Sequence, residues 1–140
     1  PGLNGALLLD GDNRNLPDRG LTAEGLAVLR WERYEAESYL LHPASLQRFL
    51  ESETEPLFAQ PALDYLRQQL PPAFFNNPLQ TTPFLRAEPA SKSLLPELMR
   101  LAQLPLCKSD YFLLARAMRP GELPPEVWDK LTAIQQVVAP

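Results

Sequence analysis

The stretch Leu7-Leu8-Leu9-Asp10-Gly11-Asp12-Asn13-Arg14 decides the fold, because an apolar run ends there in two carboxylates one residue apart. The pattern predicts a buried strand that opens into a loop at Asp10. Ligands of open α/β sheets bind outside the carboxyl ends of strands, so Asp10 and Asp12 stand where a functional site is expected. Two carboxylates this close repel each other, and a proton or a hard divalent cation relieves the repulsion. Mg²⁺ is the cation that such a pair favours.

The same residues also have a purely structural interpretation. Asp10 would cap the turn that follows the strand, and Asp12-Asn13 would form an Asx-turn, as such residues commonly do at this position. Asp-x-Asp after an apolar run is a weak motif by itself, so this segment alone leaves the metal site and the turn as open alternatives.

A second acidic segment, Arg33-Tyr34-Glu35-Ala36-Glu37-Ser38-Tyr39-Leu40-Leu41, follows an apolar run over 26–31 that predicts another short strand. Together the two segments resemble the TOPRIM-type nuclease domain of ATPases of the overcoming-lysogenization-defect (OLD) class and related AAA-type ATPases. In that family a strand ends in Asp-x-Asp, and a later strand leads into an Arg-x-Glu-x-Glu-x-Tyr-Leu-Leu signature that opens a helix. The resemblance is specific over residues 3–50 and looser over 91–118. The matching residues are Asp10, Asp12, Arg33, Glu35, Glu37, Tyr39, Leu40 and Leu41.

The resemblance implies DNA cleavage with one or two Mg²⁺ or Mn²⁺ ions, held by Asp10, Asp12 and either Glu35 or Glu37. Which of the two glutamates binds metal stays open, because the strand-to-helix turn decides which one faces the aspartates. Lys108 precedes an expected helix, and by resemblance it would reach the active site and steady the scissile phosphate or the leaving oxygen. Its alternative role is that of an exposed surface lysine.

The resemblance also implies that the sequence is a C-terminal piece of a larger ATPase-nuclease. The family's further glutamate, on the first strand of its fold, has no counterpart here, so we expect the site to be incomplete and the chain alone to be a poor nuclease. The implied partners are DNA and an ATPase domain N-terminal to the nuclease. An apolar edge of the strand that precedes Asp10 would favour a homodimer.

Composition limits the class of partner. The chain has 140 residues, 45% of them hydrophobic and 21% charged, as in an ordinary globular protein, with a net charge of −4 and a pI near 5.0. An acidic protein does not present a broad phosphate-binding face, so nucleic acid would need local basic residues. Arg14, Arg19, Arg30 and Arg33 lie near the acidic motifs and could provide them, or could simply be solvated charges.

Several other functions are excluded or disfavoured by single residues and by hydropathy. No apolar run approaches the length of a membrane span. Cys107 is the only cysteine, which excludes an internal disulfide and fits a reducing, cytoplasmic compartment. His42 is the only histidine, so a zinc site is improbable, and we expect His42 to cap or pack against the helix that follows it.

The remaining sequence predicts a helix-rich α/β fold, a partial TOPRIM-like (Rossmann-like) unit with about two short parallel strands near the N-terminus and about six helices. We expect a single domain, with the acidic motifs in 1–50 and a helical part in 51–140. Five prolines in 71–89 predict a long connection. The best-marked helices are expected from Pro43, over 62–70 entered through Pro61, over 94–103 capped by Ser93, over 110–118 capped by Ser109, and from Pro124-Pro125 through Val138.

Two other functions compete with the nuclease. Asp10 could be the nucleophile of a haloacid-dehalogenase-type phosphatase, but that motif carries Thr shortly after Asp-x-Asp, whereas Asn13-Arg14 follow here. The chain could instead be a non-catalytic helical interaction module whose acidic loop binds a protein. Divalent-metal binding that is lost in Asp10→Asn would separate the nuclease from the interaction module.

Overall fold

The computed structural model describes residues 3–14, 16–20, 22 and 24–139. Within them two strands, β1 (Gly5–Leu9) and β2 (Leu26–Arg30), pair in parallel with Leu9 opposite Arg30. In the same residues three 3-10 helices, η1 (Ala36–Leu40), η2 (Lys108–Asp110) and η3 (Pro120–Glu122), lie among seven α-helices. The expected helix-rich α/β fold with two parallel strands is therefore confirmed. The α-helices are α1 (Pro43–Glu53), α2 (Pro56–Gln69), α3 (Pro72–Asn76), α4 (Pro83–Ala87), α5 (Leu94–Leu101), α6 (Phe112–Ala117) and α7 (Pro125–Val138).

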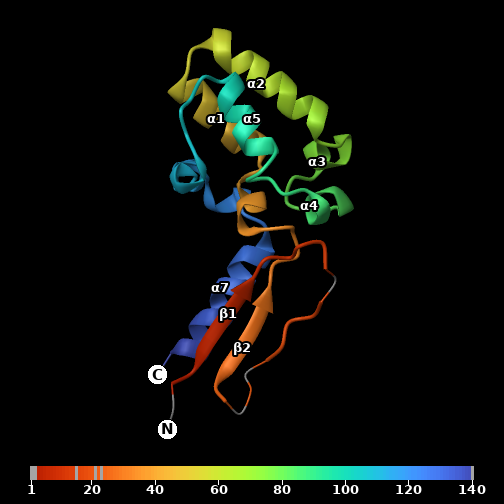
Figure 1. Ribbon diagram of the computed structural model, residues 1–140, viewed down its shortest axis with the longest axis vertical. Coiled ribbons are helices and arrows are strands. Elements are labelled where there is room, and N and C mark those ends of the chain that lie inside the picture. Colours follow the sequence, from red (N-terminus) through yellow and green to blue (C-terminus); the bar gives the residue numbers. More distant parts are fainter. Residues whose placement is uncertain (1–2, 15, 21, 23, 140) are drawn as a thin grey trace.

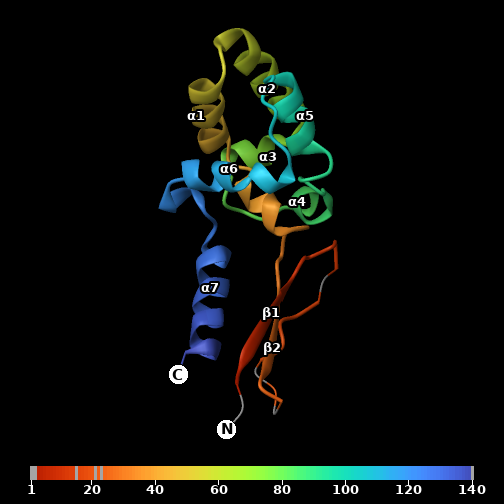
Figure 2. The same cartoon turned by 60° about the vertical axis from the view of Figure 1, so that its left-hand side comes forward.

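The molecule is elongated and has two ends of different structure (Figure 1). The strands and α7 form one end, and α1 to α6 form the other. Helix α7 lies along β1, so the last helix of the chain returns to its first strand (Figure 2). The described elements after residue 51 are all helical, and the last of them, α7, lies at the strand end.

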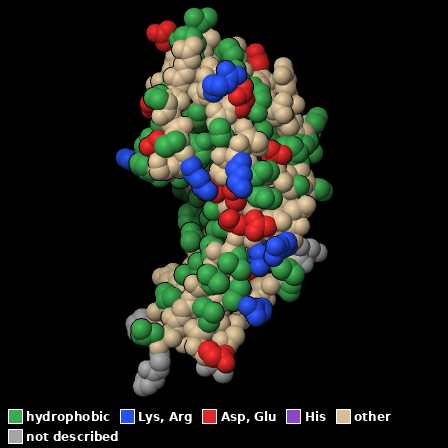
Figure 3. Space-filling view, in the orientation of Figure 1, with side chains coloured by type: hydrophobic (Ala, Val, Ile, Leu, Met, Phe, Trp, Pro, Cys, Tyr) green, Lys and Arg blue, Asp and Glu red, His purple; other side chains and the backbone are tan. Residues whose placement is uncertain are grey.

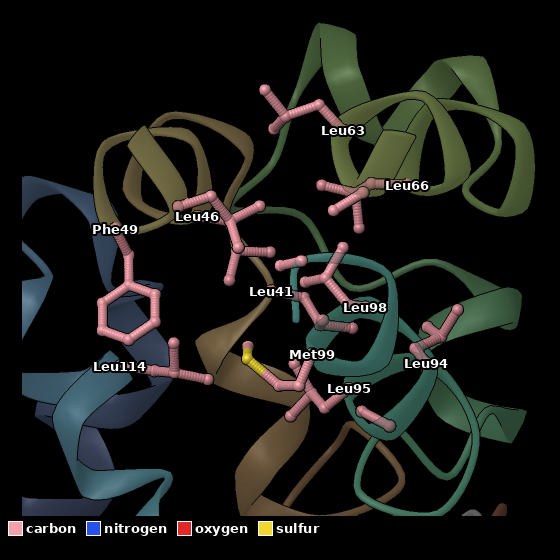
Figure 4. Close-up of a cluster of buried hydrophobic side chains, with 14 of the residues drawn as sticks. Leu41, Leu46, Phe49, Leu63, Leu66, Leu94, Leu95, Leu98, Met99 and Leu114 are labelled. Carbon is pink, nitrogen blue, oxygen red and sulfur yellow. The ribbon is translucent and has the colours of Figure 1, made fainter. Parts of the chain in front are cut away.

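The hydrophobic core lies in the helical end (Figure 4). In α1, Leu46, Phe49 and Leu50 follow the i, i+3, i+4 spacing of one helix face, and all three are buried. They meet Leu95 and Leu98 of α5 in the same cluster. Each such side chain contributes about 1.5–3 kcal/mol by leaving water, so this core, rather than the two-stranded sheet, stabilises the fold.

Prolines start helices in this chain more often than they break them. Pro43, Pro56, Pro72, Pro83 and Pro125 each occupy the first position of an α-helix, where the missing N–H has no intrahelical partner to lose. The expectation of a continuous connection over 71–89 was therefore wrong, because two of these prolines open α3 and α4.

Other predicted boundaries need correction as well. Helix α2 begins at Pro56 and contains Pro61 instead of starting after it. Ser109 lies inside η2 and does not cap α6, which begins at Phe112, and Ser93 makes no capping hydrogen bond to α5. His42 does cap α1, because its Nδ1 accepts a hydrogen bond from the Ala44 N–H at 3.2 Å. No helix in the described part of the chain is long and apolar enough to cross a membrane.

Candidate functional site

The two predicted acidic segments lie side by side because their backbones are hydrogen-bonded beyond the ends of the strands. The Trp31 N–H donates to the Leu9 carbonyl at 2.9 Å, and the Asp12 N–H donates to the Tyr34 carbonyl at 2.9 Å. Gly11 lies between these bonds, and a Cβ atom there would be 2.2 Å from the Arg33 carbonyl oxygen. Only glycine fits at this position, and it allows the chain bearing Asp10 and Asp12 to lie against the chain that leads to the glutamates.

The loop after β1 has the tight geometry that its turn-forming residues predicted. Asp12 and Asn13 both adopt left-handed backbone conformations, with φ of 53° and 58°, which Asp and Asn tolerate better than most residues. The Arg14 N–H donates to the Gly11 carbonyl at 2.9 Å and closes the turn. Arg30 Nη1 donates to the Asp10 carbonyl at 2.9 Å and so links this loop to the end of β2.

The structure distinguishes the two glutamates by their burial. Glu35 is 4% exposed, and its Oε1 accepts a 2.6 Å hydrogen bond from the Ser91 N–H. Its own N–H donates to Ser38 Oγ at 3.4 Å, which fixes the start of η1. Glu37 is more accessible and lies in η1, with its Oε1 3.6 Å from Lys108 Nζ. Glu35 therefore has a structural role through its Oε1 atom, whereas the carboxylate oxygens of Glu37 are more accessible.

The charges of these residues act on one another although the residues come from three separate segments. Burial and then the negative charges of Asp12, Glu37 and Glu35 raise the pKa of Asp10, and Lys108 opposes that rise. Figure 3 shows acidic side chains gathered at the narrow middle of the molecule, between the two ends, with basic side chains on either side of them. The structure thus places Asp12, Glu35, Glu37 and Lys108, which the sequence also singled out, near enough to Asp10 for their charges to act on it.

The carboxylates of the candidate site are the kind of ligand that a hard divalent cation prefers. Their arrangement in this structure, however, is not that of a metal site. Within the described ranges, no three His, Cys, Asp or Glu side chains converge closely enough to hold a metal ion. Asp10 and Asp12 are exposed, so water and ions in solution can reach both carboxylates. Burial and then repulsion by neighbouring carboxylates raise the pKa of Asp10, and a bound cation relieves such repulsion. The Ser91 hydroxyl is buried and has no hydrogen-bond partner among the described residues.

Arg33 does not have the role that the sequence suggested for it in nucleic-acid binding. Its side chain is 0% exposed, and its guanidinium lies 4.9 Å from the centre of the Tyr39 ring. It donates hydrogen bonds to the carbonyl oxygens of Ser38 and Pro78, both at 3.0 Å. Arg33 therefore connects η1 to the segment between α3 and α4 by buried hydrogen bonds and is not available to a phosphate.

The sequence did not predict a second set of hydrogen bonds in this region, which is made by a residue of α7. Glu126 lies in the first turn of α7 and accepts hydrogen bonds from the Tyr39 hydroxyl and, at 2.8 Å, from the Glu32 N–H. Tyr39 also packs against Trp31, with ring centres 4.8 Å apart. The only sequence signal for Glu126 was its place after Pro124-Pro125, which marks a helix start and says nothing about its partners.

Comparison of the chain with protein-family models, with curated proteins and with solved structures gave no significant match. The arguments about function below therefore rest on the residues of the site and on their arrangement.

Proposed function

We propose that this chain hydrolyses phosphodiester bonds of DNA with the help of a divalent metal ion, Mg²⁺ or Mn²⁺. The observation that supports this most is that the negative charges of Asp12 and Glu37 and the positive charge of Lys108 all act on Asp10 at the end of β1, with Lys108 Nζ 3.6 Å from Glu37 Oε1. Carboxylates beside a lysine at such an edge match the needs of phosphoryl chemistry, which are oxygen ligands for a cation and a positive charge for the phosphate.

Each residue has a distinct part in this proposal. Asp10, Asp12 and Glu37 would hold the cation, which when bound polarises the phosphate and makes a water molecule more acidic. Lys108, whose side chain is 64% exposed, can place its ammonium group on a phosphate oxygen that approaches Glu37. Glu35 orients η1 through Ser91 and Ser38, so it positions Glu37 while remaining a possible ligand through its second oxygen.

The test is nicking of supercoiled plasmid in Mn²⁺ by the wild-type chain and by Asp12→Asn. We expect nicking to fall at least 100-fold in the variant, because the site loses a charged ligand. Glu53→Gln serves as the matched control, since Glu53 is an exposed carboxylate at the far end of α1. Equal nicking by the wild type and Asp12→Asn would contradict the proposal.

Calorimetric titration with Mn²⁺ checks the first step separately from the chemistry. Binding that is present in the wild type and in Glu53→Gln but lost in Asp10→Asn supports a metal site. No binding by the wild type would favour the competing view of a non-catalytic module whose acidic loop contacts a protein.

A further inference from the structure

A hollow lined by basic side chains lies next to the carboxylates. It consists of two adjoining depressions of about 470 Å³ and 320 Å³ that share Arg14, Glu32 and Arg86. The larger one also contains Arg30, Lys130 and Asp18. We call these two depressions together the basic hollow.

The basic hollow carries a local positive charge although the chain as a whole is acidic. Four cationic side chains line it, Arg14, Arg30, Arg86 and Lys130, against the two carboxylates of Asp18 and Glu32. These residues come from the loop after β1, the end of β2, α4 and α7. The fold therefore gathers here basic residues that are far apart in the sequence, which explains why the overall charge of −4 gave no sign of them.

Two of these cations are only weakly held by the protein. Arg86 Nη2 is 4.0 Å from Glu32 Oε2, and both side chains are about half exposed, so this ion pair is worth little in water. Arg14 is exposed and forms no ion pair with any described carboxylate. By contrast, Lys130 is paired with Asp18 at 2.5 Å, and Arg30 is tied to the Asp10 carbonyl. Arg14 and Arg86 are thus the groups most available to an incoming anion.

The hollow lies beside the loop that carries Asp10 and Asp12. Asn13 lines the smaller depression and directly follows Asp12, and Arg30 lines the larger one while it contacts Asp10. A chain of phosphates that lies in the hollow would therefore pass next to the loop that carries Asp10 and Asp12. Guanidinium groups recognise phosphate oxygens through paired hydrogen bonds.

We infer that the basic hollow binds the sugar–phosphate backbone of a DNA strand beside the carboxylate site, with Arg14 and Arg86 as the main phosphate contacts. The inference rests on the proposed function for the identity of the anion, and it adds the path by which the strand approaches. It requires no metal ion, because the contacts are made by arginines.

The experiment measures binding of a fluorescein-labelled single-stranded 20-mer by anisotropy in EDTA at 50 mM salt, so that no cleavage occurs. Arg14→Glu/Arg86→Glu is compared with Arg67→Glu/Arg100→Glu, which changes the net charge equally at two exposed arginines of α2 and α5. We expect a loss of at least tenfold in affinity for the first variant and less than threefold for the second. The slope of log affinity against log salt should fall by about one for each phosphate that an arginine no longer binds.

Equal weakening by both double variants would overturn the inference, since net charge alone would then govern binding. Unchanged binding by Arg14→Glu/Arg86→Glu would overturn it as well. Because Arg86 also donates to the Glu32 carbonyl at 3.5 Å, the single variant Arg14→Glu, in the exposed loop, provides the same test if the double variant unfolds; it should lose at least threefold in affinity.

The outcome is separable from that of the proposed function. Asp12→Asn should abolish nicking and leave binding in EDTA unchanged or slightly tighter, because it removes a negative charge beside the strand. If the wild type binds DNA through Arg14 and Arg86 but does not nick it, the inference about the basic hollow is supported and the nuclease proposal is rejected. If nicking depends on Asp12 but DNA binding does not depend on Arg14 and Arg86, the nuclease proposal is supported and the inference about the basic hollow is rejected.

Discussion

At the scale of single residues, the negative charge of Asp10 should lower the stability of the fold, although the same charge is proposed to bind the metal ion. The pKa of Asp10 is raised above its ordinary value of 3.8 by burial and then by Asp12, Glu37 and Glu35. The folded state therefore binds the Asp10 proton more tightly than the unfolded chain does. It follows that the charge of Asp10 costs stability at any pH well above the raised pKa, and that this cost disappears at a pH below 3.8.

Asp10→Asn should therefore stabilise the protein at pH 7 by a few tenths of a kcal/mol, about the size expected for a largely exposed charge. Urea unfolding at pH 7 and at pH 3 measures the difference, which should be absent at the lower pH. A loss of stability at pH 7 would instead indicate that the Asp10 side chain caps the turn after β1, the structural interpretation of this residue.

Arg33 supports a second prediction at this scale. Arg33→Gln should lower the free energy of unfolding by about 2–4 kcal/mol, because a shorter neutral side chain leaves the buried carbonyl of Ser38 and the partly buried carbonyl of Pro78 without donors. Chemical denaturation provides the measurement, and Arg67→Gln, on the exposed face of α2, is the control with an expected change below about 0.5 kcal/mol. A cost for Arg33→Gln as small as that of the control would mean that water replaces the guanidinium.

The residue types at the candidate site could be predicted from the sequence, but their individual roles could not. Asp10 and Asp12 were singled out because two carboxylates after an apolar run form a local pattern, whereas Glu35 and Glu37 were singled out together through the family resemblance. Arg33 was misassigned because, apart from the Ser38 carbonyl, its hydrogen-bond acceptors come from residues 78–81, and no local pattern reveals which distant oxygens a side chain will reach. Arg86 was missed for the same reason.

At the scale of secondary-structure elements, the approach of the two strand ends depends on Gly11. A Cβ atom at this position would be 2.2 Å from the Arg33 carbonyl and 2.7 Å from the Trp31 carbonyl, and both obstacles are backbone atoms that cannot rotate away. Gly11→Ala should thus push the loop after β1 off the segment that leads to η1. We expect it to cost about 1–3 kcal/mol of stability, as overpacking does.

Gly20→Ala is the matched control, since nothing lies within 4 Å of the Cβ that it would add. Thermal unfolding of both variants measures the stability, and Mn²⁺ titration measures whether the proposed metal ligands have separated. Equal melting temperatures for the two variants would show that the strand ends have room to move apart at no cost in stability.

Helix boundaries show how far element prediction can go with a proline-rich sequence. The starts of α1 and α7 were predicted well, because Pro43 and Pro125 precede clear apolar periodicity. Helices α3 and α4 were not, because each has only five residues, too few for a periodicity to appear, and their opening prolines looked like breaks. A proline in the sequence is compatible with either the start or the interruption of a helix. Which of the two occurs depends on the packing of the folded chain.

At the scale of the whole molecule, the strand end is attached to the helical end through the residues that surround the candidate site. Glu126 at the start of α7 accepts hydrogen bonds from Tyr39 of η1 and from the Glu32 N–H just after β2. The hydrophobic core belongs to the helical end, and among the described residues the two strands have no comparable core of their own. The geometry of the carboxylates should therefore depend on this polar junction more than on apolar packing.

Glu126→Leu should loosen the strand end while it leaves the helical core intact. It removes the acceptor of two hydrogen bonds from a half-buried site, which costs about 1–3 kcal/mol. Amide hydrogen exchange should then speed up in β1, β2 and α7 by at least tenfold, with little change in α1 and α5, because local opening follows the weakest attachment. Glu126→Gln, which retains one carbonyl acceptor, should give a smaller effect. Uniform acceleration over the chain would instead indicate that the two ends unfold as one cooperative unit, and that the site is held as rigidly as the core.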